Sequence, residues 1–356
     1  MSAPQHPYQV QPDRAFWRRA VANVHPLDIG GWYRRKFELG TRPVATAGSC
    51  FAQHIGRQLR EKGFRYLDVE PAPRFLAPAS RADFGHEIYS ARYGNVYTTR
   101  QLRQLFERAH GTFEPVEDHW VHGDGVVDPF RPTIQPEPFG SVEELRRHRR
   151  EHLGAVTRIL EEAGTFVFTL GLTETWVHRE DGAVYPVAPG TAGGTWDPAR
   201  YRFANLTHAE VMADLVFVIE LARAINPAIR FLLTVSPVPL MATATPHHVV
   251  SATSYSKSVL RAVAGELADA HAHVDYFPSF EIIASTPMHG QFYEPDQRSV
   301  SMHGVRHVMQ QFFEAHPPPE RAAAAARRGA EVREGDDDDA ARDVVCDEEL
   351  LRVFGA

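Results

Sequence analysis

The sequence predicts an α/β fold in three layers, in which helices cover both faces of a parallel sheet. Short apolar segments without polar alternation recur along the chain, most clearly at residues 165–170 (TFVFTL) and 230–235 (RFLLTV). Amphipathic stretches long enough to form helices separate these segments. Strands that are apolar on both faces and alternate with helices are typical of a parallel sheet that is buried on both sides.

The predicted elements follow one another in a regular order. Gly63 ends the first helix, Ser141 caps the third, and Asn226 with the following proline ends the fourth. Strands are predicted at residues 42–47, 64–69, 165–170, 230–235 and 273–277. Helices are predicted at residues 51–62, 99–109, 141–163, 207–225, 251–271 and 301–315. Ligands of such sheets bind beyond the carboxyl ends of the strands, so the functional site is expected in the loops that follow them.

Composition divides the chain into three regions. Residues 1–41 are predicted to be an N-terminal extension, and residues 42–316 the folded domain, with a loop-rich insertion at residues 70–140. Residues 317–356 are predicted to be an acidic, flexible tail. Within this tail, residues 346–354 (CDEELLRVF) have the pattern of a short amphipathic helix. This helix is either a frayed terminus or a segment that docks on the body or on a partner protein.

Charge and cysteine content narrow the class of protein. The formal net charge is −7, and most of it lies in residues 320–356, which hold 11 acids and 6 arginines. The nearly neutral body lacks the basic surface of a protein that binds duplex nucleic acid. No apolar stretch is long enough to span a bilayer, and residues 1–17 lack the apolar core of a secretory signal. We therefore expect a cytoplasmic protein in which Cys50 and Cys346 stay reduced.

The loop after the first strand carries the strongest candidate for chemistry, Gly48-Ser49-Cys50. Glycine allows a tight turn, and the helix that follows offers unpaired N–H groups and the positive end of its dipole. A thiol at this place is expected to have a lowered pKa and to be nucleophilic, whereas a serine would need a base. In the alternative interpretation, Ser49 caps the helix and Cys50 is a small buried hydrophobic residue.

This loop, GSCFA, is the first of several strings that resemble the GSCFA domain family, which in turn resembles the SGNH/GDSL hydrolase superfamily. The resemblance runs from about residue 43 to residue 313. The other strings are SARYGNVYT (90–98), DPFRP (128–132), FVFTLGLTETW (166–176), TVSPVPL (234–240), YSKSVLRA (255–262) and DYFPSFEI (275–282). The resemblance implies a flavodoxin-like three-layer sandwich and an enzyme that hydrolyses or transfers acyl groups.

The superfamily pattern assigns catalytic roles position by position. The nucleophile falls on Cys50, with Ser49 one place before it. Thr173 stands where the superfamily has its oxyanion Asn, so the oxyanion donors implied here are the backbone N–H groups of Cys50 and Gly94 with the Asn95 amide.

The general base is left open by the same comparison. Asp296 matches the orienting acid of the superfamily's Asp-x-x-His, or else it is only a helix N-terminal acid, and Ser299 stands where the His should be. The candidates are His248, in the loop after the strand at residues 230–235, and His303, one helical turn beyond Ser299.

Three further residues are expected near the substrate. Glu174 and Trp176 follow a buried strand, where they would shape a pocket, although Trp176 could simply pack under the next loop. Lys257, one of three lysines, would bind an anionic substrate or else lie on the surface. The histidine pairs lack a third ligand at a suitable spacing, and the glycines of residues 190–194 do not form a phosphate loop, so no metal and no cofactor are expected.

The resemblance therefore implies an acyl esterase, thioesterase or acyltransferase that works through a covalent acyl-enzyme. Its substrate is expected to be a small-molecule or saccharide acyl compound, by analogy with the superfamily. The alternative hypothesis is a binding or modifying module that keeps the SGNH fold without the hydrolytic triad, with the acidic tail recruiting a partner protein.

Overall fold

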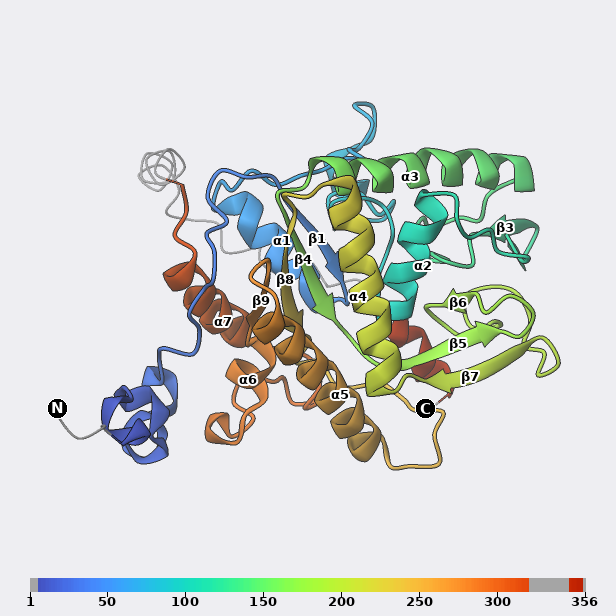
Figure 1. Ribbon diagram of the computed structural model, residues 1–356. Helices are drawn as coiled ribbons and strands as arrows, with labels where there is room; N and C mark the ends of the chain where they lie inside the picture. Colours follow the sequence, from blue (N-terminus) through green and yellow to red (C-terminus); the bar gives the residue numbers. More distant parts are fainter. Residues whose placement is uncertain (1–5, 320–345, 355–356) are drawn as a thin grey trace.

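The structure is a computed structural model, and it describes residues 6–319 and 346–354. Its centre is a parallel sheet of four strands in the order β1-β4-β8-β9 (Figure 1). The strands are β1 (Val44–Gly48), β4 (Thr165–Leu170), β8 (Arg230–Val235) and β9 (Val274–Phe277). Every residue of β1, β4 and β9 is buried, as the absence of polar alternation predicted. The predicted α/β fold with a parallel sheet is confirmed.

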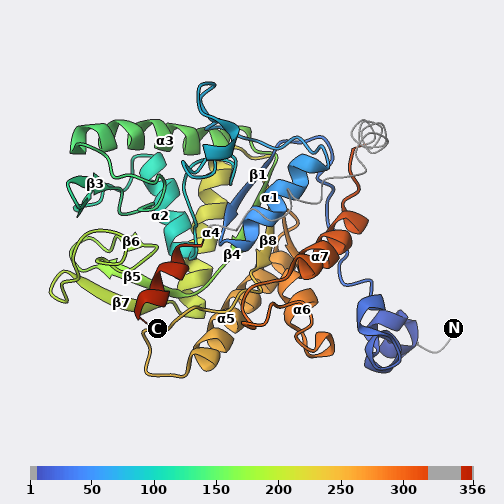
Figure 2. The same cartoon turned by 180° about the vertical axis from the view of Figure 1, so that it is seen from behind.

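Helices cover both faces of this sheet. One face packs on α1 (Phe51–Glu61), α6 (Ser279–Ala284) and α7 (Met302–Ala315), which lie in front of the sheet in Figure 2. The other face packs on α2 (Thr99–Ala109), α3 (Val142–Glu162), α4 (His208–Ile225) and α5 (Val249–Ala270). Successive strand residues point to opposite faces, so Val167 joins the first apolar cluster and its neighbours Phe166 and Phe168 join the second.

The N-terminal extension contributes to the core in its second half, where Ile29 and Leu39 pack in the same cluster as α1 and α7. Short helical turns make up most of its first half and recur in two later loops. They are η1 (Pro7–Val10), η2 (Asp13–Ala15), η3 (Arg18–Ala22), η4 (Pro26–Asp28), η5 (Pro78–Ser80) and η6 (Thr286–Met288).

The structure differs from the prediction where strands are short or antiparallel. The strand predicted at residues 64–69 is reduced to one bridge, between Val44 and Tyr66. The insertion contains an antiparallel pair, β2 (Trp120–His122) and β3 (Gly125–Val127). A second sheet, in the order β6-β5-β7, is formed by β5 (Glu174–His178), β6 (Val184–Tyr185) and β7 (Tyr201–Asn205). Segments of two to five residues are too short to show a clear period in the sequence.

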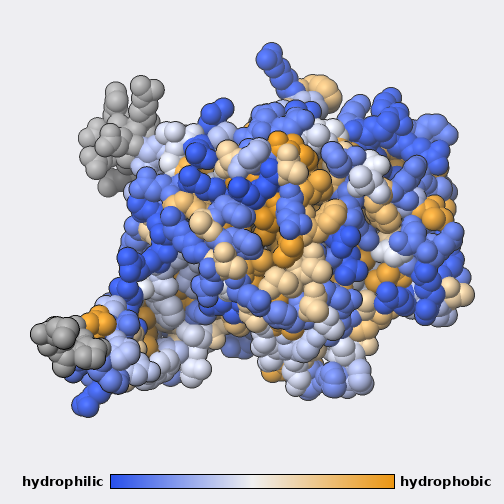
Figure 3. Space-filling view, viewed as in Figure 1, coloured by the Kyte–Doolittle hydropathy of each residue, from blue (hydrophilic) through white to orange (hydrophobic). Residues whose placement is uncertain are grey.

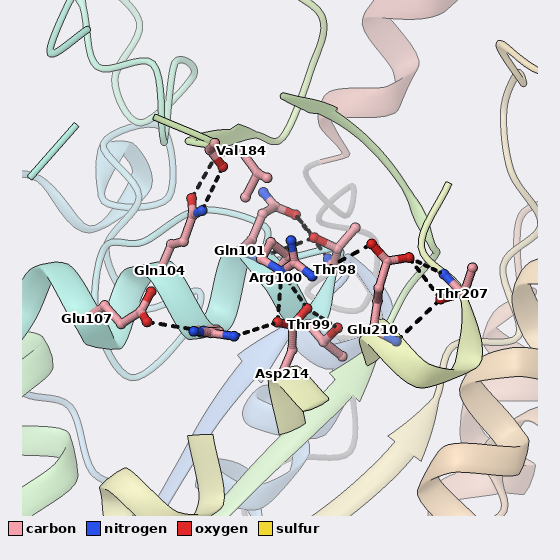
Figure 4. A network of polar contacts seen from close by, with 12 residues as sticks. Thr98, Thr99, Arg100, Gln101, Gln104, Glu107, Val184, Thr207, Glu210 and Asp214 are labelled. Carbon is pink, nitrogen blue, oxygen red and sulfur yellow. Dashed lines mark hydrogen bonds and ion pairs between the residues drawn. The ribbon is translucent and has the colours of Figure 1, made fainter. Parts of the chain in front are cut away.

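A buried carboxylate joins α2 to α4. The side chain of Asp214 on α4 is fully buried, and both of its oxygens accept hydrogen bonds of 2.7 Å from Nε of Arg100 on α2 (Figure 4). Arg103 adds a second ion pair at 3.4 Å. Buried charges are tolerated only when they are paired and hydrogen-bonded. This pairing fixes α2, and with it the loop that precedes α2 at residues 94–98.

Helix α4 is apolar around most of its circumference. Val211, Leu215 and Val218 are buried against the sheet, while others on the helix, including Met212 and Val216, are only partly buried. Figure 3 shows apolar side chains gathered at the centre of the face that carries this helix. Among the described residues, no helix combines the length and apolar character needed to cross a membrane.

Candidate active site

Three loops meet at the carboxyl edge of the parallel sheet, as expected for this fold class. They follow β1 (residues 48–50), precede α2 (residues 94–97) and follow β4 (residues 171–173). Backbone hydrogen bonds join them: Ser49 N–H donates to Thr169 O (3.1 Å), Val96 N–H to Gly48 O (2.9 Å), and Leu172 N–H to Tyr97 O (3.1 Å). The candidate residues on these loops are therefore neighbours in space.

Gly48 makes the turn that carries Ser49 and Cys50. Its φ is +140°, and a Cβ on it would lie 2.4 Å from the carbonyl oxygen of Thr169. No residue with a side chain fits there, because its Cβ would overlap the next strand. The turn places Cys50 at the N-cap of α1, and both Ser49 and Cys50 are buried.

The Cys50 thiol differs from the prediction in its acidity. A hydrogen bond with Cys346, and after it burial, raises the pKa of Cys50 well above its usual value. The expected lowering of this pKa by the helix N-terminus is therefore wrong for the described arrangement. The same hydrogen bond lowers the pKa of Cys346, so Cys346 is the more acidic of these two free thiols.

Ser49 lies beside Cys50 at the same small cavity. Its carbonyl oxygen accepts a hydrogen bond from the Tyr89 hydroxyl (3.1 Å). Its own hydroxyl is buried and has no hydrogen-bond partner among the described residues. A buried hydroxyl without a partner costs free energy, and such groups recur at functional sites.

Asn95 presents its amide to the site in a fixed orientation. Its Oδ1 accepts hydrogen bonds from the Tyr89 hydroxyl (2.6 Å) and from Nε2 of Gln53 (3.2 Å). Because Oδ1 is held in this way, Nδ2 points to the opposite side, where it donates to Asp347 (2.9 Å). Gly94, the neighbouring residue, has a φ of +66°, which a glycine adopts without strain.

Lys257 is buried at the site and is not a surface lysine. It lies on α5, only 3% exposed, and its Nζ donates to the carbonyl oxygen of Gly171 (2.6 Å). Burial lowers its pKa to about 8, although the negative charge of Glu348 acts in the opposite direction. Lys257 lines the same cavity as Ser49 and Cys50. A substantial fraction of its amine is therefore neutral at mildly alkaline pH.

The two predicted bases lie away from this cavity. His248 is exposed at the N-cap of α5, where its Nδ1 accepts a hydrogen bond from Val250 N–H (3.2 Å). His303 is exposed on α7, with its ring 5.5 Å from that of Phe292. Within residues 6–319 and 346–354, neither imidazole is hydrogen-bonded to Ser49 or Cys50.

Asp296 and Ser299 pair with each other. The Ser299 hydroxyl donates to Oδ2 of Asp296 (2.7 Å), and Ser299 N–H donates to Oδ1 (2.9 Å). No histidine contacts Asp296 in the described part of the chain. Arg298, which directly precedes Ser299, contacts Glu348 and Cys346 at the site, and the sequence analysis missed it. The only sequence signal for Arg298 was its position within residues 296–299, the segment that matches the superfamily's Asp-x-x-His.

The C-terminal segment, residues 346–354, docks in the site. Its 3-10 helix, η8 (Asp347–Phe354), lies beside the second sheet in Figure 2. Asp347 is 4% exposed, and burial raises the pKa of its carboxyl group. The carboxylate accepts hydrogen bonds from Asn95, from the Thr133 hydroxyl and from the Tyr97 hydroxyl. Of the alternatives left open above, docking on the body is confirmed, while residues 320–345 of the predicted tail lie outside the described residues.

Glu348 and Cys346 complete this contact. Nη2 of Arg298 donates to Glu348 (3.0 Å) and approaches Sγ of Cys346 (3.9 Å). Met241 N–H also points to the Glu348 carboxylate (3.4 Å). The segment thus places one carboxylate on the Asn95 amide and a second beside the cations of Arg298 and Lys257.

The second sheet forms one wall of a large apolar chamber next to the site. Its volume is about 940 Å³. Most of the walls are apolar or aromatic, and they include Trp176, Trp196, Phe203, Leu240, Met241 and Leu351. Leu172, Leu240 and Glu348 line both the chamber and the small cavity at Cys50, so the two spaces adjoin.

Glu174 and Thr173 lie at the start of the second sheet. Glu174 lines the chamber and accepts hydrogen bonds from the Thr243 hydroxyl (2.6 Å) and from Ala244 N–H (3.3 Å). Burial raises the pKa of this carboxyl group. Thr173 is fully buried, and its hydroxyl donates to Asn205 (2.5 Å). Its hydroxyl therefore faces the second sheet and not the Asn95 amide.

No group of three or more His, Cys, Asp or Glu residues in the described parts of the chain is arranged to hold a metal ion. The groups that the structure brings together at this site are thiols, hydroxyls, an amine, a guanidinium group, an amide and the two carboxylates of Asp347 and Glu348.

The fold and the site together define an α/β sandwich in which Ser49 and Cys50 lie on a buried turn at the carboxyl edge of the sheet. The model of the GSCFA family matches residues 43–312, and the chain belongs to this family. A search of curated protein sequences gave no match.

Two solved structures resemble the chain weakly. A mutant acetyl esterase with an acetate ion has 8% identity and a TM-score of 0.31, and a carbohydrate esterase of family 3 from Talaromyces cellulolyticus has 10% identity and a TM-score of 0.28. Each comparison covers 82% of this chain and 100% of the other.

Proposed function

We propose that this protein is an acyl-transfer enzyme, an esterase, thioesterase or acyltransferase, in which Cys50 forms a covalent acyl intermediate. The observation that carries the proposal is the position of Cys50, at the N-terminus of α1 and in one cavity with the buried amine of Lys257. A nucleophile needs a neighbouring base or a lowered pKa to be reactive. Lys257 is the neighbouring group of the right chemistry, because its pKa of about 8 leaves part of it neutral.

These positions support the following course of the proposed reaction. The neutral amine of Lys257 takes the proton of the Cys50 thiol, and the thiolate attacks the carbonyl carbon of the acyl substrate. The carbonyl oxygen becomes an oxyanion. Asn95 Nδ2, released from Asp347 when the C-terminal segment moves away, and the N–H groups at the start of α1 donate hydrogen bonds to it. As the tetrahedral intermediate collapses, the ammonium group of Lys257 returns the proton to the leaving group. Water or an acceptor hydroxyl then cleaves the thioester of Cys50 and releases the acyl group.

Separate substitutions of the two candidate nucleophiles test this proposal. We expect Cys50→Ala to lower kcat/KM for p-nitrophenyl acetate and for an acyl thioester by a factor of at least about 10³, because the covalent step is lost. Ser49→Ala is expected to keep most of the activity. Mass spectrometry of the stalled reaction should find the acyl group on the peptide that contains Cys50.

Ser254→Ala is the matched control, since Ser254 lies on α5 with its hydroxyl bonded to Val250 O (2.9 Å) and away from the cavity. Loss of activity in Ser49→Ala with retention in Cys50→Ala would move the nucleophile to Ser49. Full activity in both variants would overturn the covalent mechanism.

One observation supports a second candidate, a binding module without hydrolytic activity. Neither His248 nor His303 is hydrogen-bonded to Cys50 within the described residues, and Asp347 occupies the Asn95 amide. This candidate predicts no turnover of ester or thioester and no acyl adduct on Cys50, with ligand binding intact.

A further inference from the structure

The chain's own C-terminal segment occupies the candidate site with two kinds of group. Its polar end supplies the carboxylates of Asp347 and Glu348, which lie on donors of the body. Its apolar side chains, Leu351 and Phe354, line the chamber next to Cys50. The segment is thus an anionic group followed by apolar groups, and it lies along the two adjoining cavities.

The donors that hold the polar end suit a carboxylate or the oxyanion of an acyl group. Asn95 Nδ2, the Thr133 hydroxyl and the Tyr97 hydroxyl converge on Asp347. Arg298 and Lys257 provide the positive charges that face Glu348. Such preorganised donors in a buried site bind a carboxylate product and stabilise developing negative charge on a carbonyl oxygen.

The segment leaves part of the site unsatisfied. With the segment in place, the Ser49 hydroxyl and Nε of Arg298 are buried without a hydrogen-bond partner in the described residues. The chamber also keeps a volume of about 940 Å³, in the range of sites that bind small molecules. A segment that only completed the fold would be expected to fill this space and to satisfy these atoms.

We propose that the chamber and the adjoining polar cavity bind an apolar acyl chain of medium length, and that residues 346–354 bind there as an intramolecular substitute for it. The reactive carbonyl, and after hydrolysis the carboxylate, lies in the polar region that the carboxylates of Asp347 and Glu348 occupy in the structure. The acyl chain of the ligand extends into the chamber between Trp176, Leu240 and Met241. That the ligand is an acyl group rests on the proposed function. That the ligand has an apolar end and an anionic end is inferred from the residues of the site.

The test measures binding in the full chain carrying Cys50→Ala, which cannot form an acyl-enzyme. Decanoate is the probe, and acetate and decanol are its comparisons, because each lacks one of the two ends. By calorimetry we expect decanoate to bind at least about tenfold more tightly than either, since both the apolar chain and the charge contribute.

Substitutions in the segment and in the body are expected to act in opposite directions. Glu348→Gln weakens the substitute and should tighten decanoate binding by a factor of about three or more, because a larger fraction of the protein is open. Arg298→Gln removes a donor of the site and should weaken binding. Glu349→Gln is the matched control, since Glu349 is exposed and pairs only with Arg352 in the described chain. Thermal unfolding of each variant checks that it is folded.

Equal binding of decanoate and acetate would overturn the assignment of the chamber to an acyl chain. Weaker binding in Glu348→Gln would show that the segment is part of the ligand site and not a substitute for the ligand. Both results are independent of catalysis, so they are distinguishable from a failure of the proposed function, which would appear as absent turnover with binding intact.

Discussion

Lys257 is the residue whose environment most determines what the site can do. Burial among α5, the loop after β4 and the C-terminal segment removes most of its hydration, so the charged form is disfavoured and its pKa falls to about 8. A lysine in water is fully charged at neutral pH and cannot accept a proton. The same residue at this position is partly neutral, which is the property that a general base requires.

The pH dependence of acylation should report this pKa. We expect the acylation rate to rise with pH through about 8, as the amine loses its proton. Lys257→Met should remove this rise and lower the rate by a factor of at least about 10². The burst of p-nitrophenolate, measured across this range, gives the rate directly. Lys62→Met is the control, because Lys62 is exposed at the end of α1. A wild-type rate that does not change with pH would contradict the role of Lys257.

The lowered pKa of Lys257 also makes the stability of the protein depend on pH, and the direction of this dependence follows from the direction of the pKa shift. The pKa of Lys257 is lower in the folded protein than its ordinary value of 10.5. Between pH 8 and 10.5 the unfolded chain therefore holds a proton that the folded protein does not. The contribution of Lys257 to the free energy of unfolding accordingly increases as the pH rises through this window.

At the level of elements, a buried charge cluster ties the insertion to α3. Asp128, just after β3, is 2% exposed and accepts hydrogen bonds from Arg131 Nε (3.0 Å) and from Arg149 Nη2 of α3 (3.0 Å). Burial alone would raise its pKa, but the guanidinium groups of Arg149, Arg131 and Arg108 hold the pKa well below the usual value. The long insertion is held in place by this cluster, and with it the Thr133 hydroxyl that reaches the site.

Removing the negative charge of Asp128 should destabilise the folded protein. We expect Asp128→Asn to lower the free energy of unfolding by about 3 kcal/mol, because Arg131 and Arg149 lose the buried carboxylate with which they form ion pairs. Urea unfolding at neutral pH measures the loss, with Asp124→Asn, in the exposed turn between β2 and β3, as the control. The wild-type contribution is present above the ordinary pKa of 3.8 and is lost as the pH falls below it, so the difference between variant and wild type should shrink in acid. An equal loss in both variants would contradict this account.

Some helices and strands could be predicted from local sequence patterns, and others could not. The long helices from α2 to α5 and the strands β4 and β8 were predicted to within a few residues, because caps and unbroken apolar runs define them locally. The strands β5, β6 and β7 were missed, because their pairing depends on contacts between Trp176, Tyr185 and Phe203 that are distant in sequence.

For the whole molecule, the central feature is that the first strand of the domain and the C-terminal segment at residues 346–354 meet at one site. Cys50 follows the first strand and Cys346 lies in the final described segment, yet their thiols are hydrogen-bonded. The closed arrangement buries Cys50 and raises its pKa, and both effects slow the reaction of a thiol with an electrophile. In this arrangement a reagent from the solvent can reach Cys50 only if the C-terminal segment moves away.

Thiol alkylation should measure this opening. We expect iodoacetamide to label the peptide that contains Cys50 slowly in the wild-type protein. In Asp347→Asn labelling should be at least about fivefold faster, because that carboxylate is hydrogen-bonded to Asn95 and its loss favours the open state. Mass spectrometry separates this peptide from that of Cys346. Glu349→Gln should leave the rate unchanged, and an unchanged rate in Asp347→Asn as well would show that the segment does not control access.

The sequence by itself determined the α/β class, the family and the position of the turn that carries Ser49 and Cys50. These depend on local features: apolar runs, caps, and a glycine before Ser49 and Cys50. The tertiary structure alone decided which groups surround that turn. It buried Lys257, paired Arg298 with Glu348, and placed the Asp347 carboxylate on the Asn95 amide. These contacts join residues as much as 252 positions apart, and no local pattern records such pairings, because they depend on how the whole chain packs.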